Sequence, residues 1–404
     1  MKVPWKIAIV VVAILLAVMV CHNTRPRRLT AQDTLLATPV PAELATHEAV
    51  TGRSEQTSSL CVVSNVPLAG GFADADYRKR EVTRLARQGA AERRTAVERA
   101  EHEGWDPRTE TDSESSRLIA IRDGRPYVLI THNRNAGISI AVDRVRNTDP
   151  FNLSGSGRTI GLWDAGHALS THQELAGRVS VMDGSPYWQG HSTHVGGTIG
   201  ASGVVAMAIG MAPAVRIDSY DWNGDLSEMA SRAMAVPGET NKIQVSNHSY
   251  GPSTGWVGLS PLRWYGTWGA QESDGFGSYE TDAAELDTIC WNAPYYQPFM
   301  SSGNDRSDSV PAEGEFFSYY DSGWRQTAYN SSIHPHADNW DNGGYDTIPT
   351  RGSAKNIVTV GCVNDAVSGG TRFLAGATMT SYSSWGPTDD GRVKPDLVAN
   401  GDMV

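Results

Sequence analysis

The feature that most constrains the fold of this 404-residue chain is an alternation of short apolar runs, glycine-rich turns and helical segments that begins after residue 152. Four runs have the length and composition of buried strands: residues 158–163, 243–246, 296–300 and 357–360. Residues 226–234 have helical spacing and lie between the first two runs. Strands that alternate with helices form a parallel sheet covered by helices, so we predict an α/β domain over residues 150–404.

Two longer segments interrupt this pattern. Residues 252–279 and 305–350 are rich in Gly, Ser, Asp, Trp and Tyr and show neither strand nor helix periodicity. Long segments of this kind inside a compact domain are usually surface loops. We therefore predict two surface insertions.

A smaller module is predicted over residues 73–149, which we call the leader module. Residues 76–103 carry Ala, Arg and Glu with apolar residues at helical spacing, and Gly104 supplies a stop, so we expect one or two amphipathic helices. The apolar runs 118–121 and 127–130 flank Asp123-Gly124, which predicts a β-hairpin. From its position ahead of the larger domain, our hypothesis is that this small α+β module is an intramolecular chaperone or inhibitor.

The N-terminus has the design of an export signal. Lys2 and Lys6 precede an apolar run over residues 7–20, which as a helix spans about 20 Å and is shorter than a bilayer core of about 30 Å. We predict a signal peptide or signal anchor over residues 1–21 and a flexible linker over residues 22–72. The protein is expected to be exported, either secreted or periplasmic, or held at the membrane by this segment alone.

Charge and cysteine content exclude other classes. The net charge of -11 argues against a nucleic-acid partner, and the arginines of residues 78–94 are interleaved with glutamates. Four cysteines, one of them at the end of the apolar leader, make no disulfide framework. Cys290 and Cys362 either pair or remain as two thiols.

Two segments carry the chemistry of a charged pair. Residues 159–166, Thr-Ile-Gly-Leu-Trp-Asp-Ala-Gly, read as a strand that ends in the carboxylate of Asp164, and the carboxyl ends of parallel strands are where catalytic groups gather. Residues 190–198, Gly-His-Ser-Thr-His-Val-Gly-Gly-Thr, read as a loop that enters a helix of small residues. A His at such a position can contact a carboxylate through one ring nitrogen and act as a general base through the other.

Together these segments resemble the subtilisin-like serine proteases, the subtilases, whose His motif usually reads His-Gly-Thr-His-Val-Ala-Gly. The resemblance implies a three-layer αβα fold in which His191 is the general base, Asp164 orients it and His194 packs inward. Ser192 replaces the usual Gly and Gly196 the usual Ala. Upstream, residues 92–135 are similar to the leader modules that precede such domains in some secreted bacterial relatives.

A metal site is the alternative for the two histidines. His191 and His194 are three residues apart with no Glu between them, unlike the His-Glu-x-x-His arrangement of zinc hydrolases. We therefore predict no metal ligands there. The family often binds calcium, but we locate no ligand set: Asp221, Asn223, Gly224 and Asp225 mimic part of a calcium loop, yet Arg232 stands where a bidentate Glu is needed, so a surface loop is predicted. No cofactor is required.

The oxyanion donor is predicted from residues 299–305, Phe-Met-Ser-Ser-Gly-Asn-Asp, a strand that ends in Gly-Asn. Subtilases place at this point an Asn whose amide donates to the oxyanion of the tetrahedral intermediate, which implies this role for Asn304. The alternative is a turn Asn that tolerates a positive φ.

Peptide binding is implied by residues 245–251, Val-Ser-Asn-His-Ser-Tyr-Gly, which are similar to the substrate-binding strand of the family. An extended polypeptide would pair with this strand through backbone hydrogen bonds. Ser249, Tyr250 and Gly251 would line one side of the cleft, and Ser302 and Gly303 the other. The alternative for Asn247 and His248 is an interior strand with a hydrogen-bonded His.

The last motif is the most specific. Residues 382–387 and 391–401 resemble the family segment that precedes the Gly-Thr-Ser-Met of the nucleophile, and the printed chain ends at Val404 before such a Ser. We expect a serine endopeptidase domain that is incomplete at its C-terminus and inactive as printed. Two other classes stay open: a binding protein that keeps the peptide cleft, and a metal hydrolase that uses the two histidines.

Overall fold

The computed structural model describes most of the chain after residue 70. The described residues are 71–104, 107–110, 115–122, 125–131, 141–146, 149–204, 209–258, 261–340, 343–364, 366–368 and 371–401. The predicted export signal and nearly all of the predicted linker lie outside them. Within these ranges, no helix has both the length and the apolar character needed to cross a bilayer.

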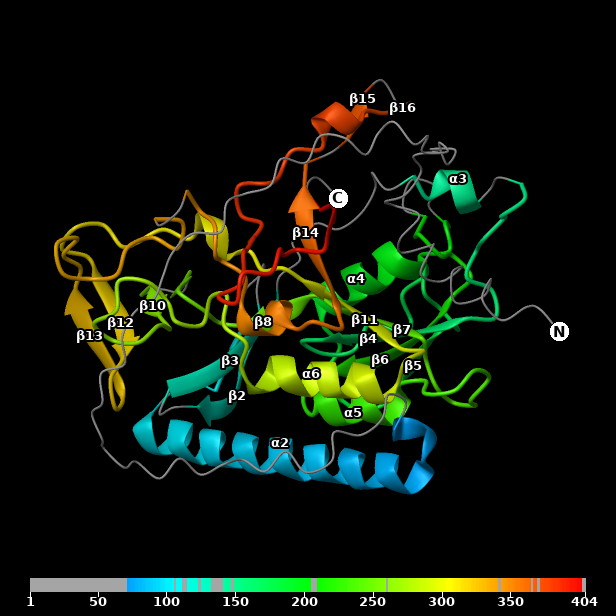
Figure 1. The fold of residues 1–404 in the computed structure, drawn as a ribbon, viewed down its shortest axis with the longest axis horizontal. Coiled ribbons are helices and arrows are strands. Elements are labelled where there is room, and N and C mark those ends of the chain that lie inside the picture. The colour runs from blue at the N-terminus through cyan, green and yellow to red at the C-terminus, as the bar shows by residue number, and fades with distance from the viewer. Residues whose placement is uncertain are drawn as a thin grey trace, which may run out of the picture. The chain divides into compact units, whose positions relative to one another are not determined.

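The centre of the fold is a seven-stranded sheet in which every neighbouring pair is parallel (Figure 1). Its strand order is β17-β14-β11-β7-β4-β6-β5. In chain order the strands are β4 (Thr159–Asp164), β5 (Val179–Val181), β6 (Arg216–Asp221), β7 (Val245–His248), β11 (Gln297–Ser301), β14 (Val358–Val363) and β17 (Leu397–Asn400). The predicted parallel α/β fold is confirmed.

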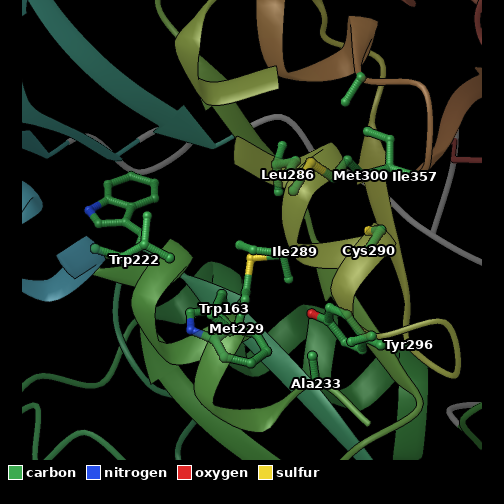
Figure 2. Close-up of a cluster of buried hydrophobic side chains, with 14 of the residues drawn as sticks. Trp163, Trp222, Met229, Ala233, Leu286, Ile289, Cys290, Tyr296, Met300 and Ile357 are labelled. Atoms are coloured by element: carbon green, nitrogen blue, oxygen red, sulfur yellow. The ribbon is translucent and has the colours of Figure 1, made fainter. Parts of the chain in front are cut away.

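Helices cover both faces of this sheet. The apolar residues of α5 (Asp225–Arg232) and α6 (Thr281–Asn292) share one buried cluster with Trp163, Tyr220 and Met300 of the strands. Figure 2 shows this cluster, with Met229 of α5 and Ile289 of α6 close to Trp163. The apolar residues of α4 (Gly190–Gly200) pack in a second cluster with alternate strand residues. The result is three layers, because neighbouring strand residues point to opposite faces.

The leader module contains one continuous helix, α2 (Ala75–Glu103), followed by a hairpin. The side chain of Asp74 caps its N-terminus by accepting a hydrogen bond from the Tyr77 N–H, and Gly104 ends it with a φ of 74°. The helix is preceded by η1 (Gly71–Ala73) and followed by β1 (Arg108–Glu110), β2 (Ser115–Arg122), β3 (Arg125–Thr131) and α3 (Asp143–Arg146). The predicted helix and hairpin are confirmed.

A strand of the α/β domain joins the leader hairpin. The antiparallel sheet has the order β1-β2-β3-β8, in which β8 (Tyr250–Pro252) follows directly on β7. Strand β3 therefore occupies one edge of the segment that the sequence marked as a peptide-binding strand.

The two predicted surface loops contain strands of a second small sheet, which we call the inserted sheet. It has the order β13-β12-β10-β9 and combines strands of both insertions: β9 (Trp256–Val257), β10 (Arg263–Trp264), β12 (Phe316–Tyr320) and β13 (Trp324–Ala328). Trp256, Trp264, Phe317 and Tyr329 are buried between them. The prediction missed these strands because β9 and β10 have only two residues each and because β10 pairs with β12, which lies far away in the sequence. The rest of the two insertions consists largely of turns and loops, as predicted.

Smaller elements complete the described chain. Strands β15 (Val367–Ser368) and β16 (Thr371–Arg372) form a hairpin, and the 3₁₀ turns are η3 (Asp305–Ser307), η4 (Thr350–Ser353) and η5 (Leu374–Gly376). Cys290 is buried and Cys362 is half-buried, and neither forms a disulfide. Of the two possibilities for these cysteines, the structure supports two thiols.

Candidate active site

Asp164 is the last residue of β4, a strand in the interior of the large sheet. Its side chain is fully buried, and its Oδ1 accepts a hydrogen bond of 2.7 Å from the Ala165 N–H. The strand thus ends with a carboxylate fixed in one orientation at the carboxyl edge of the sheet, the edge where α/β folds bind ligands.

His191 lies in the first turn of α4 and faces this carboxylate. Its Nδ1 is 2.9 Å from both Oδ1 and Oδ2 of Asp164, and its side chain is 12% exposed. A carboxylate at Nδ1 favours the tautomer with the proton on that nitrogen, so Nε2 is the nitrogen able to accept a proton. The two residues that the sequence linked are therefore joined in the structure.

The two departures from the usual His motif fit this local geometry. The hydroxyl of Ser192 donates to the Gly166 carbonyl at 2.5 Å, which ties the start of α4 to the turn after Asp164. At Gly196, an added Cβ would lie 3.4 Å from Ala168 and 3.5 Å from Leu162, which is ordinary van der Waals contact. The usual Ala would therefore fit, and neither substitution disturbs the pair.

His194 lies one turn further along α4 and is half-buried. Burial, and then the charge of His191, lower its pKa. Among the residues that the structure describes, no group of three or more His, Cys, Asp or Glu side chains could hold a metal ion.

Asn304 follows β11, which is separated from β4 by β7 alone. The alternative reading, a turn Asn with a positive φ, is wrong: Gly303 takes the positive φ of 101°, whereas Asn304 has a φ of -116°. The motif Gly-Asn therefore places the backbone strain on the glycine. Since the sheet is parallel, Asn304 lies at the same edge of it as Asp164.

The segment around residues 382–387 fixes this loop. The backbone N–H of Ser384 donates to the Gly303 carbonyl at 3.0 Å, and the Ser384 hydroxyl donates to the carboxylate of Asp305 at 3.1 Å. The guanidinium of Arg306 donates to the carbonyls of Thr380 and Ser383. Two motifs that the sequence analysis treated separately are thus one hydrogen-bonded unit.

The predicted peptide-binding residues are largely buried. Ser249, Tyr250 and Ser302 are each less than 9% exposed, and Gly303 is buried. The Tyr250 hydroxyl donates to Asp225 at 2.6 Å inside the core, so its side chain does not line a cleft. The contribution that we predict for Tyr250 and Gly251 is therefore limited to their backbone in β8.

His248 is a hydrogen-bonded histidine of an interior strand, which was the alternative to a role in peptide binding. It is 1% exposed, its Nε2 is 2.8 Å from the Ser246 hydroxyl, and its Nδ1 is 3.1 Å from the Tyr250 hydroxyl. Burial, and then the charge of Arg351, hold its pKa well below the usual value. It is a neutral interior histidine.

The leader strand β3 pairs with the backbone of β8 in antiparallel register. Leu129 lies opposite Pro252, Ile130 opposite Gly251, and Thr131 opposite Tyr250. Because Tyr250 is the residue of β8 closest in sequence to the carboxyl end of β7, β3 runs toward the edge of the sheet where Asp164 lies. This edge of β8 is the one an added peptide strand would use if β3 were absent.

A buried ion network, formed by Arg122, Asp225, Asp282 and Arg351, was missed by the sequence analysis. Arg351 contacts Asp225 at 2.5 Å and Asp282 at 2.7 Å, and Arg122 of the leader contacts Asp282 at 2.7 Å. The Tyr127 hydroxyl, also of the leader, donates to Asp282 at 2.8 Å. The prediction that residues 221–225 are only a surface loop is thus wrong for Asp225, which is buried against Arg351.

The charges of this network decide the state of Asp282. Burial would raise the pKa of its carboxyl, but the neighbouring charges of Arg351 and Arg122 outweigh burial and hold the pKa well below its usual range. Asp282 is therefore ionised and relies on cations from both the domain and the leader. No local signal could have revealed this, because Tyr127 and Asp282 are 155 residues apart.

Glu228 is a second carboxyl with an unusual environment, and it contacts strand β4. It accepts a hydrogen bond of 2.8 Å from the indole N–H of Trp163, the residue before Asp164. Burial raises its pKa to about 8, and the charges of Asp183 and Asp225 add to the effect. At neutral pH the carboxyl of Glu228 is mainly protonated.

The family model of the subtilases, described as "Subtilase family", matches residues 155–403. This match covers more than half of the chain, and the chain therefore belongs to the subtilase family. Its fold and the sequence motifs around Asp164 and His191 agree with this assignment.

Two relatives from Dictyostelium discoideum are similar to the chain. The Serine protease/ABC transporter B family protein tagB is 25% identical over 266 residues, and the corresponding protein tagD is 25% identical over 257 residues. These alignments cover 58% and 56% of this chain but only 13% and 14% of the relatives. The chain thus spans about one seventh of the length of these relatives.

Solved structures of proteases also match. The S41 psychrophilic protease shares 16% identity at a TM-score of 0.36, over 64% of this chain and 71% of that one. The MycP3 protease from a type VII secretion system shares 15% identity at a TM-score of 0.33, over 56% of this chain and 57% of that one.

Proposed function

We propose that this chain is the catalytic region of a serine endopeptidase that hydrolyses polypeptides through an Asp-His-Ser triad. The observation that carries the proposal is the contact of His191 Nδ1 with the buried carboxylate of Asp164 at 2.9 Å. Family membership supports it. The proposed mechanism requires no cofactor.

In the proposed mechanism His191 Nε2 accepts the proton of the nucleophilic serine and later delivers it to the leaving amine. Asp164 holds the imidazole in the required tautomer and stabilises its charged form. The amide of Asn304 donates to the oxyanion, an interaction worth about 2.7–4 kcal/mol for the corresponding Asn of subtilisin. In the family segment that residues 382–401 resemble, the nucleophilic serine stands in a Gly-Thr-Ser sequence.

The first test uses the chain as printed. In its proton NMR spectrum we expect a strongly downfield resonance from the Nδ1–H of His191, because this proton is shared with a buried carboxylate. The resonance should disappear in His191→Gln and move upfield in Asp164→Asn, while His194→Gln should leave it in place. If the resonance does not respond to Asp164→Asn, the pair does not form in solution.

The second test asks whether hydrolysis follows. If the coding DNA past codon 404 encodes Gly-Thr-Ser, in frame or after one frameshift, the polypeptide extended to include it should cleave denatured protein substrates. Loss of that activity on replacing the Ser by Ala would support the triad. Peptide binding without hydrolysis in the extended chain would instead favour the non-catalytic binding protein.

The leader module is proposed to inhibit the domain in cis. Support comes from the register of β3 on β8, which occupies the edge that an extended substrate would use. In the extended polypeptide, expression from residue 150 should then either raise activity, if inhibition dominates, or abolish folding, if the module acts as a chaperone. Equal activity and equal yield with and without the module would contradict both roles.

Export is part of the proposal and depends on residues 1–21. The expected product is secreted or periplasmic, or remains at the membrane if the segment is not cleaved. N-terminal sequencing of the mature protein distinguishes these outcomes.

A further inference from the structure

The C-terminal half of α2 packs on the inserted sheet. Ala96 and Ala100 of this helix are fully buried and share an apolar cluster with Val257, Tyr265 and Trp324 of the inserted sheet and its connections. Small residues on a helix allow close approach of a neighbouring surface, so two alanines facing an aromatic pair form a compact contact. Leu118 of the leader hairpin belongs to the same cluster.

Both insertions contribute to this contact. Tyr265 comes from the first insertion and Trp324 from the second, and their rings meet edge to face with centroids 5.4 Å apart. Tyr320, also from the second insertion, packs edge to face on Trp324 and carries the guanidinium of Arg99 of α2 at 5.5 Å from its ring centroid. The aromatic face therefore exists only when strands of the two insertions are paired.

An ion pair between the leader hairpin and the first insertion helps to orient the leader module. The guanidinium of Arg125, at the start of β3, donates two hydrogen bonds of 2.7 and 2.8 Å to the carboxylate of Asp274 in the first insertion. Asp274 also accepts from the hydroxyl of Thr267. Because the pair is partly exposed, it contributes little free energy, but its two-point geometry fixes the hairpin relative to the insertion.

The N-terminal half of α2 has a different partner. There Arg78 pairs with Glu239 at 3.2 Å, and Arg84 pairs with Glu285 of α6 at 2.9 Å. One half of α2 thus contacts α6 and the segment after α5 through ion pairs, and it also buries Leu85 in the apolar cluster of α5 and α6. The other half contacts aromatic rings of the inserted sheet.

We propose that the inserted sheet is a docking platform for the leader module, formed by Val257, Tyr265, Tyr320 and Trp324, and that it holds α2 so that β3 stays on β8. The occupant of this surface is the segment of this same chain that contains α2 and the hairpin. The functional consequence rests on the proposed inhibitory role of the leader, whereas the docking itself does not. Removal of the leader would expose the aromatic face to solvent.

The test is hydrogen exchange of the full chain, followed by mass spectrometry. In Trp324→Ala we expect amide exchange in the C-terminal half of α2 to become about tenfold faster or more, because the loss of one large aromatic contact favours local opening. Phe316→Ala is the matched control, since Phe316 lies in the same sheet but is 61% exposed. Exchange in β11 should be the same in all proteins. Unchanged exchange in α2 of the Trp324 variant would overturn the proposal.

A variant on the leader side covers the case in which Trp324→Ala loosens the inserted sheet itself. Ala100→Glu keeps a strong helix former but places a charge against the aromatic face. We expect faster exchange in α2 and unchanged exchange in β12 and β13. If α2 keeps its protection in this variant, the platform does not hold the leader. The peptidase assays above report separately on the function of the domain, so failure of either idea is recognised on its own.

Discussion

The proposed catalytic pair, Asp164 and His191, and the buried ion network bring polar side chains together by opposite routes. Asp164 and His191 are 27 residues apart and lie at the end of one strand and the start of the next helix. The network joins Arg122 of the leader to Asp282 and Arg351 of distant elements. The comparison teaches that a pair such as Asp164 and His191 can be recognised from two short sequence motifs. The charged residues that hold two modules together can be recognised only from the tertiary fold.

The largest expected effect concerns the catalytic pair. In the extended polypeptide, Asp164→Asn should lower kcat by about 10⁴-fold, because an amide favours the wrong tautomer of His191. Steady-state hydrolysis of a peptide substrate measures this loss. Thermal unfolding is the control, since the variant must remain folded; a folded variant with nearly normal kcat would separate the pair from catalysis.

The ion network should matter for stability rather than for chemistry. Asp282→Asn leaves Arg351 and Arg122 without their shared counter-charge and should lower the free energy of unfolding by about 3–5 kcal/mol. Urea unfolding of the full chain measures it. Asp274→Asn removes the partly exposed partner of Arg125 and should cost at most about 1 kcal/mol. Equal losses in the two variants would contradict the distinction between buried and surface pairs.

Asn304 tests whether the oxyanion loop belongs with the catalytic pair. Asn304→Ala in the extended polypeptide should lower kcat by about 10²–10³-fold with little change in KM, since the amide acts on charge that develops in the transition state. Asn330→Ala is the matched control, since Asn330 is an exposed asparagine just after β13. A rise in KM with unchanged kcat would instead assign Asn304 to substrate binding.

Glu228, which contacts the residue before Asp164, should make the stability of the protein depend on pH. Its pKa is about 8 in the folded protein and about 4.3 in an unfolded chain, so the folded state binds the proton more tightly. The resulting stability is fully present below about pH 4 and is lost as the pH rises through 8. Between pH 5 and pH 8.5 the free energy of unfolding of the wild type should therefore fall by about 1–3 kcal/mol more than that of Glu228→Gln, which cannot ionise. Parallel stability profiles between these pH values would contradict the raised pKa.

Four of the seven strands of the large sheet, β4, β7, β11 and β14, were predictable because the sequence shows them as short runs rich in apolar residues. The other three were not predicted: β5 has only three residues, and β6, Arg-Ile-Asp-Ser-Tyr-Asp, is not an apolar run. The predicted starts of the four strands differ from the observed ones by one or two residues; β7, for example, begins at Val245 because Ile243 makes only an isolated bridge with Ala233. The proximity of Asp164 and His191 was predictable from local motifs, since Asp164 is the last residue of β4 and His191 lies in the first turn of α4. Asn304 stands just before η3.

The inserted sheet and the leader contacts were not predictable, because their partners lie far apart in the chain. Strands of two residues such as β9 and β10 carry no period, and they form only because the aromatic residues of both insertions are buried together. The pairing of β3 with β8 likewise depends on how the leader lies on the domain. Sequence patterns report which face of an element is apolar, but not which distant element covers it.

The unbroken course of α2 has a mechanical consequence. Its 29 residues make a helix about 44 Å long. One half is held by arginine–carboxylate pairs and by Leu85 in the apolar cluster of α5 and α6, and the other half by aromatic rings of the inserted sheet. Because one stiff helix joins the two contact regions, an end that has opened stays close to its own binding surface while the other end is still bound. The opened end therefore rebinds before the other end dissociates. Dissociation of the leader module is then cooperative, because both contact regions must open together. A single proteolytic cleavage outside α2 would leave the module bound.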